Sequence, residues 1–246
     1  MEIRGTTTLV GILGWPVSHS LSPAMQNAAF ASLGLDWAYV PLPTPPEDLA
    51  AAVRGLAAAG FAGANVTIPH KTHVLALCDE VEPLAAEAQS VNTLVFDDGS
   101  VHGSSTDVVA IAELVEAAGR RALVLGGGGS AKAVVAALRG AGGDVTVATR
   151  HDPSWPPDGR DFDIVVNATP VKDDPIVSPR SDQQIVDLPY TPNGAPTALV
   201  LAAREAGCER IVDGLDVLLA QGAASFERWT GLPAPLVAMR QALRRG

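Results

Sequence analysis

One stretch of the chain in which apolar and polar residues alternate reads Asn65-Val66-Thr67-Ile68-Pro69-His70-Lys71. This alternation is typical of a half-buried strand, and it predicts that Val66 and Ile68 face the core while Asn65 and Thr67 share the other face. The proline ends the strand and suits the first turn of a helix. Lys71 then lies just beyond the carboxyl end of the strand, where open α/β sheets bind ligands. The alternative is a solvated strand face followed by a surface lysine.

Apolar runs elsewhere in the chain predict that strands and helices alternate. Strands are predicted at residues 9–13, 37–41, 91–96, 101–102, 122–125, 145–148, 163–167, 184–187 and 210–212. Apolar stripes at helical spacing predict helices at residues 22–33, 45–59, 72–78, 108–118, 133–138, 196–206, 215–230 and 235–244. This order favours an α/β fold with a largely parallel sheet, and the Asp98-Gly99 hairpin turn adds an antiparallel strand at one edge. A polar junction places a domain boundary near residue 106.

Hydroxyl side chains gather at the start of the first predicted helix. Ser22 followed by Pro23 is typical of an N-cap with proline at the first helical position. Ser20 adds a hydroxyl beside the same N-terminus, where free N–H groups and the helix dipole favour an anion. Capping alone would explain Ser22 but not Ser20. Thr44 and Glu47 predict a capping box at the start of the next helix.

A glycine-rich stretch follows the continuous apolar strand at residues 122–125. It reads Gly126-Gly127-Gly128-Gly129-Ser130-Ala131, and a helix and another strand come after it. This order fits the Gly-x-Gly-x-x-Gly/Ala fingerprint of dinucleotide-binding folds, with Gly126, Gly128 and Ala131 in the defining positions. The first two glycines let the backbone approach a pyrophosphate, and the small Ala131 allows close helix packing. The strongly apolar flanks argue against a flexible linker.

The end of the next strand predicts which dinucleotide is bound. A fold that binds NAD places Asp or Glu there to hold the ribose hydroxyls. This strand ends Ala148-Thr149-Arg150-His151, without an acid, and Arg150 suits a 2′-phosphate. The alternative is that Arg150 is merely a surface residue. The stretch 151–161 holds three prolines and is too short and broken for an ordinary crossover helix.

Composition argues against several classes of protein. The formal net charge of −10 is unlike that of nucleic-acid-binding proteins, whose binding depends on basic surfaces. The sequence contains no run of about 18 apolar residues, so no membrane span is predicted. The start Met1-Glu2-Ile3-Arg4-Gly5 is not typical of a signal peptide. Cys78 and Cys208 follow no metal-ligand spacing. We therefore expect no metal, and two buried thiols in a cytoplasmic protein.

Several short motifs follow one another along nearly the whole chain. They are Ser20-Leu21-Ser22-Pro23, Asn65-Val66-Thr67-Ile68-Pro69-His70-Lys71, Val91-Asn92-Thr93, Thr106-Asp107, the glycine loop, Asn167-Ala168-Thr169, Asp187-Leu188-Pro189-Tyr190 and Asp213-Gly214-Leu215 through Gln221. This set resembles the shikimate dehydrogenase family, which reduces 3-dehydroshikimate to shikimate with NADPH in chorismate and aromatic amino acid biosynthesis. The resemblance implies a small-molecule substrate as the only partner, and a monomer or homodimer.

The resemblance also implies a division of labour along the chain. Residues 1–106, with returning helices over 214–246, would form the substrate-binding domain, and residues 107–213 a Rossmann-like domain that binds NADP(H). Lys71 and Asp107 would be the catalytic pair. The residues implied for the substrate are Ser20, Ser22, Asn65, Thr67, Lys71, Asn92, Asp107, Tyr190 and Gln221, with both serines and Tyr190 at its carboxylate. Those implied for the cofactor are Gly126, Gly127, Gly128, Gly129, Ser130, Ala131, Thr149, Arg150, Thr169 and Gly214.

Three departures from the family pattern stand out. Ser105 and Val108 replace the usual Asn and Gly around Thr106-Asp107, and Asp107 could alternatively be only a cap on the following helix. The family's Asn-Arg-Thr is Thr149-Arg150-His151 here, which keeps only the arginine. The stretch 151–161 is shorter than the family's usual connection. We therefore expect a preference for NADP over NAD that is weaker than in relatives with the full motif.

The implied chemistry suits the two residues of the pair. Ketone reduction needs a hydride on carbon and a proton on oxygen, and a lysine, with a reference pKa of about 10.4, is a ready proton donor. A carboxylate beside the lysine favours its charged form. The alternatives are a quinate or quinate/shikimate dehydrogenase, an aminoshikimate-type relative, or a metabolite-binding sensor without turnover. The presence of both Lys71 and Asp107 argues against the sensor.

Overall fold

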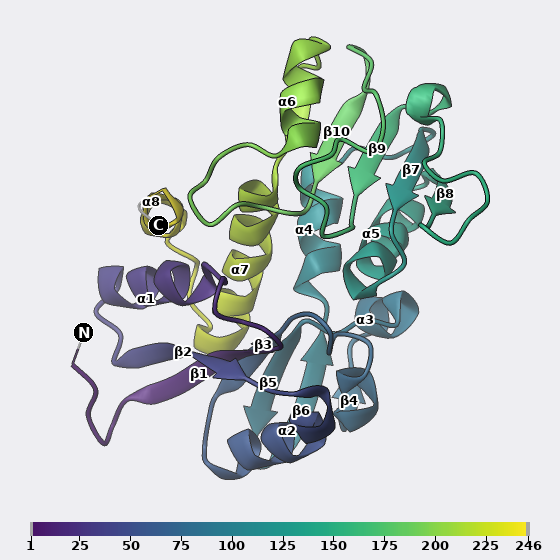
Figure 1. The fold of residues 1–246 in the computed structure, drawn as a ribbon. Helices are drawn as coiled ribbons and strands as arrows, with labels where there is room; N and C mark the ends of the chain where they lie inside the picture. The colour runs from purple at the N-terminus through teal and green to yellow at the C-terminus, as the bar shows by residue number, and fades with distance from the viewer. Residues whose placement is uncertain (1, 245–246) are drawn as a thin grey trace. The chain divides into compact units, whose positions relative to one another are not determined.

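The computed structural model describes residues 2–244 and divides into two compact units. The first unit comprises Met1–Thr106 and Leu219–Gly246, and the second comprises Asp107–Leu218. The division falls inside the long helix α7 (Gly214–Thr230). Each unit is a β-sheet with helices packed on it (Figure 1), which confirms the predicted α/β fold class. Within residues 2–244, no helix is long and apolar enough to cross a membrane.

The first unit is built on a six-stranded sheet with the order β2-β1-β3-β5-β6-β4. The strands are β1 (Thr8–Gly14), β2 (Trp37–Pro43), β3 (Gly63–Val66), β4 (Glu80–Val81), β5 (Thr93–Asp97) and β6 (Ser100–Ser104). All neighbours pair in parallel except β5, which runs antiparallel to β3 and β6. The predicted antiparallel edge strand is therefore wrong. The reversed strand β5 lies inside the sheet, between β3 and β6, and the short strand β4, which the sequence did not reveal, forms the edge.

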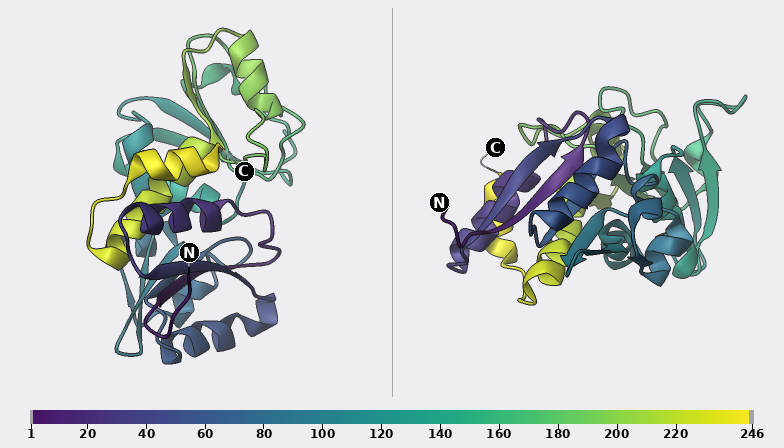
Figure 2. Two further views of the ribbon diagram at one scale, coloured as in Figure 1. Left: turned by 90° about the vertical axis from the view of Figure 1, so that its left-hand side faces the viewer. Right: turned by 90° about the horizontal axis from the view of Figure 1, so that it is seen from below.

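Helices cover both faces of this sheet. On one face, α2 (Leu49–Ala58) packs through Leu49 and Val53 against the core of β1, β3 and β5. On the other face, the Nε1–H of Trp229 in α7 donates to Leu94 O of β5 at 2.9 Å. Helices α1 (Ser22–Ser32) and α8 (Leu236–Leu243) lie side by side (Figure 2). The polar face of the sheet considered below is the one toward α7.

The segment after β3 differs from the prediction. The strand ends at Val66, so the alternation does not continue, and Ile68 is 62% exposed instead of facing the core. The predicted helix over 72–78 is only the 3₁₀ turn η2 (Val74–Leu77), and the helix α3 (Pro83–Ala88) was missed. The capping box at Thr44 is also wrong, because its hydroxyl donates to Leu42 O at 2.9 Å and the 3₁₀ turn η1 (Pro46–Asp48) precedes α2.

The second unit has an all-parallel sheet with the order β11-β10-β9-β7-β8. Its strands are β7 (Arg121–Leu125), β8 (Asp144–Ala148), β9 (Ile164–Asn167), β10 (Gln184–Asp187) and β11 (Arg210–Val212), and its helices are α4 (Thr106–Leu114), α5 (Gly129–Gly140) and α6 (Ala198–Glu205). Leu199 and Ala203 of α6 pack on Leu123, Val165 and Ile185. The proline-rich stretch holds only the 3₁₀ turn η3 (Gly159–Asp161), as predicted.

Both cysteines are free thiols. Cys208 is buried, as expected, and its Sγ donates to Arg180 O at 2.9 Å. Cys78 is only partly buried, contrary to expectation, although its desolvation and the nearby Asp79 raise its pKa to about 11. A thiol with a raised pKa is protonated and unreactive at neutral pH, so Cys78 has the character of a structural residue.

Candidate active site

The first unit holds a group of buried polar side chains on the face of its sheet toward α7. We call it the polar cluster, and its members are Tyr39, Asn65, Asn92, Thr93, Thr106, Gln221 and Ser225. The pairing of β3 with β5 sets Asn65 opposite Thr93, and α7 brings Ser225 within 2.9 Å of both. None of the members is more than 9% exposed. Segments far apart in the sequence therefore meet in one hydrogen-bonded group.

Asn65 uses both ends of its amide inside the polar cluster. The Tyr39 hydroxyl donates to Asn65 Oδ1 at 2.8 Å. Asn65 Nδ2 lies 2.9 Å from Ser225 Oγ and 3.1 Å from Thr93 Oγ1. Its two N–H groups are thus engaged with neighbours, whereas Oδ1 has two lone pairs and can accept from a further donor.

Asn92 and Gln221 meet in the same group. Asn92 Oδ1 accepts from the backbone N–H of Thr106 at 2.7 Å, and Asn92 Nδ2 lies 3.3 Å from Gln221 Oε1. The hydroxyls of Thr93, Thr106 and Ser225 lie 2.9–3.1 Å from one another. Three of the predicted substrate residues, Asn65, Asn92 and Gln221, are therefore brought together. The bond to Thr106 also fixes the backbone immediately before Asp107.

Thr67 and Lys71 lie in the turn that follows β3. The methyl group of Thr67 packs so closely on Gly14 that a side chain there would collide with it. The carbonyl of Lys71 accepts the N–H of Val91 at 2.9 Å, which sets Lys71 beside the residue that precedes Asn92. The structure thus anchors Thr67 against the end of β1 and Lys71 beside the chain entering β5.

The start of α1 corrects the predicted cap. Ser20 Oγ accepts the N–H of Ser22 at 3.2 Å, whereas no side chain caps the helix from the N-cap position, which Leu21 occupies. Leu21 already has helical dihedral angles, so Ser22 lies inside the first turn and is not the N-cap. Ser22 is buried and Ser20 is half-buried. Both hydroxyls nevertheless lie at this N-terminus, as predicted.

The glycine loop in the second unit lies against the ends of two neighbouring strands. Gly126 has a φ of +120°, which favours glycine, and its N–H donates to Ala148 O at the end of β8 at 2.8 Å. A Cβ at Gly126 would lie 3.0 Å from Ala168 O, just after β9. Helix α5 begins at Gly129 with Gly128 as its N-cap, four residues before the predicted start. The N-terminus of this helix therefore lies among the glycines, and a helix N-terminus in a glycine-rich loop suits an anion.

Asn167, at the end of β9, holds the loop that carries Thr169. Asn167 Oδ1 accepts from the N–H and the hydroxyl of Thr169 at 2.9 and 2.7 Å, and its Nδ2 donates to Asp187 Oδ1 at 2.8 Å. The Thr197 hydroxyl donates to the other oxygen of Asp187. Burial raises the pKa of Asp187 to about 6, although the bonds from Thr197 and Asn167 act in the opposite direction. This carboxylate therefore ties β9, β10 and the start of α6 together.

Tyr190 and Gly214 line one pocket within the second unit. Its volume is about 160 Å³, and Thr197, Arg204 and Asp213 also line it. A side chain at Gly214 would collide with the carbonyls of Leu188 and Pro189, so only glycine fits there. Across residues 2–244, the structure has no group of three or more His, Cys, Asp or Glu side chains that could hold a metal ion.

The strand end after β8 carries an acid that the sequence analysis did not consider. Asp152 Oδ2 accepts from the backbone N–H of Thr149 at 2.5 Å and from the Thr149 hydroxyl at 3.1 Å. The expectation that no acid lies at this strand end is therefore wrong, because a tight turn folds Asp152 back onto it. A Cβ at Gly127 would lie 3.4 Å from the Thr149 methyl group, so this turn borders the glycine loop.

Comparison with known proteins identifies the family. Residues 12–94 match the sequence model of the shikimate dehydrogenase substrate binding domain, and residues 214–244 match that of the shikimate 5′-dehydrogenase C-terminal domain. The shikimate dehydrogenase (NADP(+)) of Rubrobacter xylanophilus is 43% identical to this chain, and the match covers 98% of this chain and 97% of the relative. The chain belongs to the shikimate dehydrogenase family. This confirms the family that the motifs predicted.

Solved structures of the shikimate dehydrogenase family share this fold. The shikimate 5-dehydrogenase of Thermus thermophilus, in complex with NADP(H) and shikimate, has a TM-score of 0.84 and 34% identity, and the match covers 97% of this chain and 99% of that one. The shikimate 5-dehydrogenase of Listeria monocytogenes, in complex with shikimate and NAD, has a TM-score of 0.85 and 28% identity over 99% and 98% of the two chains. Relatives with this fold thus bind either nicotinamide dinucleotide.

Several residues that organise this shikimate dehydrogenase family site were not predicted as site residues, although Thr93 and Asp187 belong to the motifs that carry the resemblance. Tyr39, Thr93 and Ser225 complete the polar cluster, and Asp187 and Thr197 hold the loops of the second unit. A buried hydroxyl on a strand or helix resembles any other until its partner is known. Asp152 did have a weak signal, since an acid three residues after Thr149 and before a proline is typical of a turn.

Proposed function

We propose that the protein catalyses the NADP-dependent, reversible reduction of 3-dehydroshikimate to shikimate. The observation that carries this proposal is the full-length similarity to relatives named shikimate dehydrogenase (NADP(+)), one of which is 43% identical. The predicted function, enzyme class and cofactor agree with those names. Cytoplasmic location and a monomeric or homodimeric state stay predictions.

In this proposal, residues of the first unit hold the substrate. The hydroxyls of Ser20 and Ser22, at the N-terminus of α1, bind its carboxylate, which a helix N-terminus also attracts. Tyr190 is assigned to the substrate as well, as the resemblance to the family implies. Asn65 Oδ1 and the Thr67 hydroxyl form hydrogen bonds with the ring hydroxyls of the substrate.

Asn92 acts on the substrate mainly through Gln221. The Asn92 side chain already bonds to both backbone and hydroxyl of Thr106 and to Gln221 Oε1. We assign the Gln221 amide to a ring hydroxyl, and its bond to Asn92 helps to hold it in position. The polar cluster thus serves as the rigid support of the residues that touch the substrate.

Lys71 supplies the proton in the proposed reaction. When bound, NADPH provides the hydride to the carbonyl carbon. The Lys71 ammonium then gives its proton to the carbonyl oxygen, and in the reverse direction the neutral amine accepts the proton of the alcohol. We assign the Asp107 carboxylate to a ring hydroxyl of the substrate. The bond between Thr106 and Asn92 supports the backbone position of Asp107.

The second unit holds the cofactor in this proposal. The N-terminus of α5 and the glycine loop bind the pyrophosphate, and Thr149 and Arg150 bind the adenosine end with its 2′-phosphate. The open space at Gly128 supports this assignment, because nothing lies within 4 Å of an added Cβ there and a ligand can approach the backbone. Thr169 lies on the loop that follows β9, and Gly214 is the first residue of α7, just after β11. The first unit is therefore proposed as the substrate-binding domain and the second as the cofactor-binding domain.

An activity scan tests the proposal. The purified protein is assayed for oxidation of shikimate and of quinate, each with NADP and with NAD. We expect the highest kcat/KM with shikimate and NADP. A higher kcat/KM for quinate would identify the enzyme as a quinate dehydrogenase instead. Binding of shikimate without any turnover would support the metabolite sensor and contradict the proposal.

A further inference from the structure

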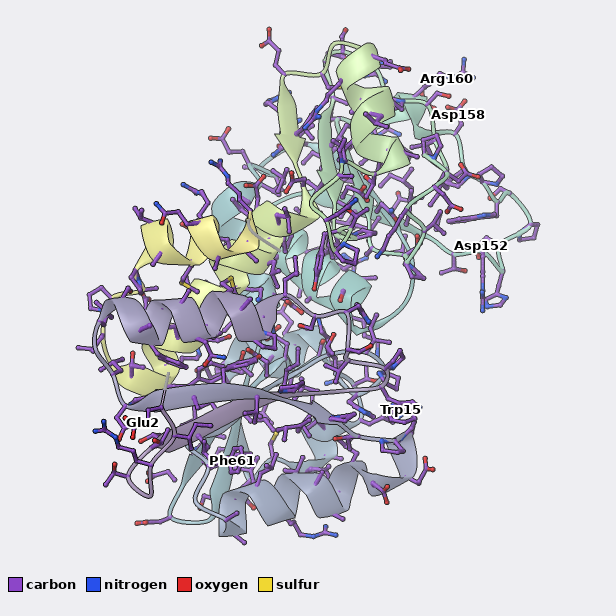
Figure 3. All side chains as sticks on the ribbon, turned by 60° about the vertical axis from the view of Figure 1, so that its left-hand side comes forward. Glu2, Trp15, Phe61, Asp152, Asp158 and Arg160 are labelled. Carbon is purple, nitrogen blue, oxygen red and sulfur yellow. The ribbon has the colours of Figure 1, made fainter. Side chains whose placement is uncertain are left out.

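Asp152 lies in the loop (Figure 3) that follows β8. Its N–H donates to Thr149 O at 2.9 Å, which closes a turn, and its carbonyl accepts the N–H of Trp155 at 3.0 Å. The carboxylate in turn accepts from the N–H and the hydroxyl of Thr149. Backbone and side-chain bonds therefore hold this negative charge in one place.

That place is where dinucleotide-binding folds recognise the ribose next to adenine. The turn follows β8 directly and borders the glycine loop, since Gly126 bonds to Ala148 O and Gly127 faces the Thr149 methyl group. In such folds a carboxylate at the end of this strand accepts hydrogen bonds from the ribose hydroxyls of NAD. Asp152 provides that carboxylate from a position beyond the strand itself.

A 2′-phosphate would meet both competition and repulsion there. It would need N–H and O–H donors, and the two donors of Thr149 already bond to Asp152. A phosphate monoester carries a charge of about −1.5 to −2 at pH 7, so a nearby carboxylate repels it. Arg150 is the one arginine or lysine in the stretch 148–155, and Asp152 carries the opposite charge two residues later.

We propose that Asp152 is a specificity-determining residue that weakens the discrimination between NADP and NAD by occupying the Thr149 donors and opposing Arg150. The inference rests on the proposed function in that it assumes a nicotinamide dinucleotide as cofactor. The proposal explains the expected weak preference for NADP over NAD by the presence of Asp152. The loss of the Asn and Thr of the family's Asn-Arg-Thr motif is then not the only cause. The competing explanation is that Asp152 only closes the turn.

Binding of two nucleotides that differ in a single phosphate separates these explanations. Adenosine 2′,5′-bisphosphate and AMP are titrated calorimetrically into the wild type and into Asp152→Asn, which keeps an oxygen to accept from Thr149 but removes the charge. We expect Asp152→Asn to tighten binding of the bisphosphate by about tenfold or more and to change AMP affinity by less than about threefold. The ratio of kcat/KM with NADP to kcat/KM with NAD should rise in parallel.

Asp144→Asn is the matched control, because it removes the same charge at the opposite, exposed end of β8. Equal effects of the two variants would show a general charge effect and overturn the proposal, as would unchanged bisphosphate affinity in Asp152→Asn. Failure to bind either nucleotide would overturn it as well. A wild type that binds both nucleotides but oxidises no shikimate would contradict the proposed function alone, because the binding measurement does not depend on turnover.

Discussion

The two units present polar groups in opposite ways. In the first unit, the polar cluster is built from side chains that bond to one another, such as Asn65 to Ser225 and Asn92 to Thr106. In the second, the glycine loop presents backbone groups, and what matters is the absence of a Cβ at Gly126. The first kind of site is broken by removing atoms and the second by adding them. The largest effect on activity, however, should come from Lys71, which belongs neither to the polar cluster nor to the glycine loop.

Lys71 should separate chemistry from stability. Because it lies outside the polar cluster, Lys71→Ala should lower kcat for shikimate oxidation by about 10²–10⁴ and change the free energy of unfolding by less than about 1 kcal/mol. Steady-state kinetics and urea unfolding measure the two effects. Lys132→Ala, which removes an exposed lysine, serves as the control. A folded Lys71→Ala variant with normal kcat would rule out the proposed proton donor.

Asn65 should show the opposite behaviour in the absence of ligand. Asn65→Ala removes the acceptor that Asn65 Oδ1 offers to the Tyr39 hydroxyl and the N–H groups that lie beside Ser225 and Thr93 inside the buried polar cluster. We expect the free energy of unfolding to fall by about 3 kcal/mol, since removing one partner from a buried hydrogen-bonded group costs about 1–3 kcal/mol. Asn193→Ala, in an exposed loop, is the control. A loss no larger than that of the control would mean that the cluster contributes little to stability.

Asp187 should give the second unit a distinct dependence on pH. Its pKa is raised to about 6 in the folded state, so between pH 4 and pH 6 the folded state binds more protons than the unfolded one. Its contribution to the free energy of unfolding therefore falls as the pH rises through this window, by roughly 3 kcal/mol in all. Asp187→Asn removes the titration, so its stability relative to wild type should rise between pH 4 and pH 7. Parallel unfolding curves for the two proteins would contradict this expectation.

Substitution of Gly126 tests how an added Cβ in the glycine loop changes the free energy of unfolding. Gly126→Ala must hold φ near +120° with a Cβ 3.0 Å from Ala168 O, which should cost about 1–3 kcal/mol of stability. Gly128→Ala is the matched comparison, because its φ is −80° and nothing lies within 4 Å of the added Cβ. Its free energy of unfolding should stay within about 0.5 kcal/mol of wild type. Equal losses in both variants would show that the loop has no special need for glycine at Gly126.

The smallest expected effect concerns the two serines of α1. Ser20→Ala removes the acceptor for the Ser22 N–H and should cost about 1 kcal/mol, whereas Ser22→Ala removes no cap. Both variants should raise the KM for shikimate if the hydroxyls bind its carboxylate. Thermal unfolding and steady-state kinetics measure the two effects. A larger loss of stability in Ser22→Ala would restore Ser22 as the cap.

The sequence could reveal what is set locally. The strand at 122–125 and the glycines after it were predictable, because apolar runs and positive φ values depend on neighbouring residues. Ser225 was not, because its partner Asn65 lies 160 positions earlier in the chain. Ile68 was misplaced because the alternation gives no sign of where a strand ends. Asp152 was missed because a turn carries it back to a strand that it does not belong to.

The path of the chain also determines the order in which the two units can complete folding during synthesis. Residues 1–106 leave the ribosome first, but Asn65 and Leu94 find their partners Ser225 and Trp229 only when α7 has been synthesised. The second unit is contiguous in the chain and can complete its sheet before that point. Domains fold as units during synthesis, generally from the N-terminus. Here the first unit cannot complete its fold, and the polar face of its sheet stays uncovered, until the segment after Leu218 has left the ribosome.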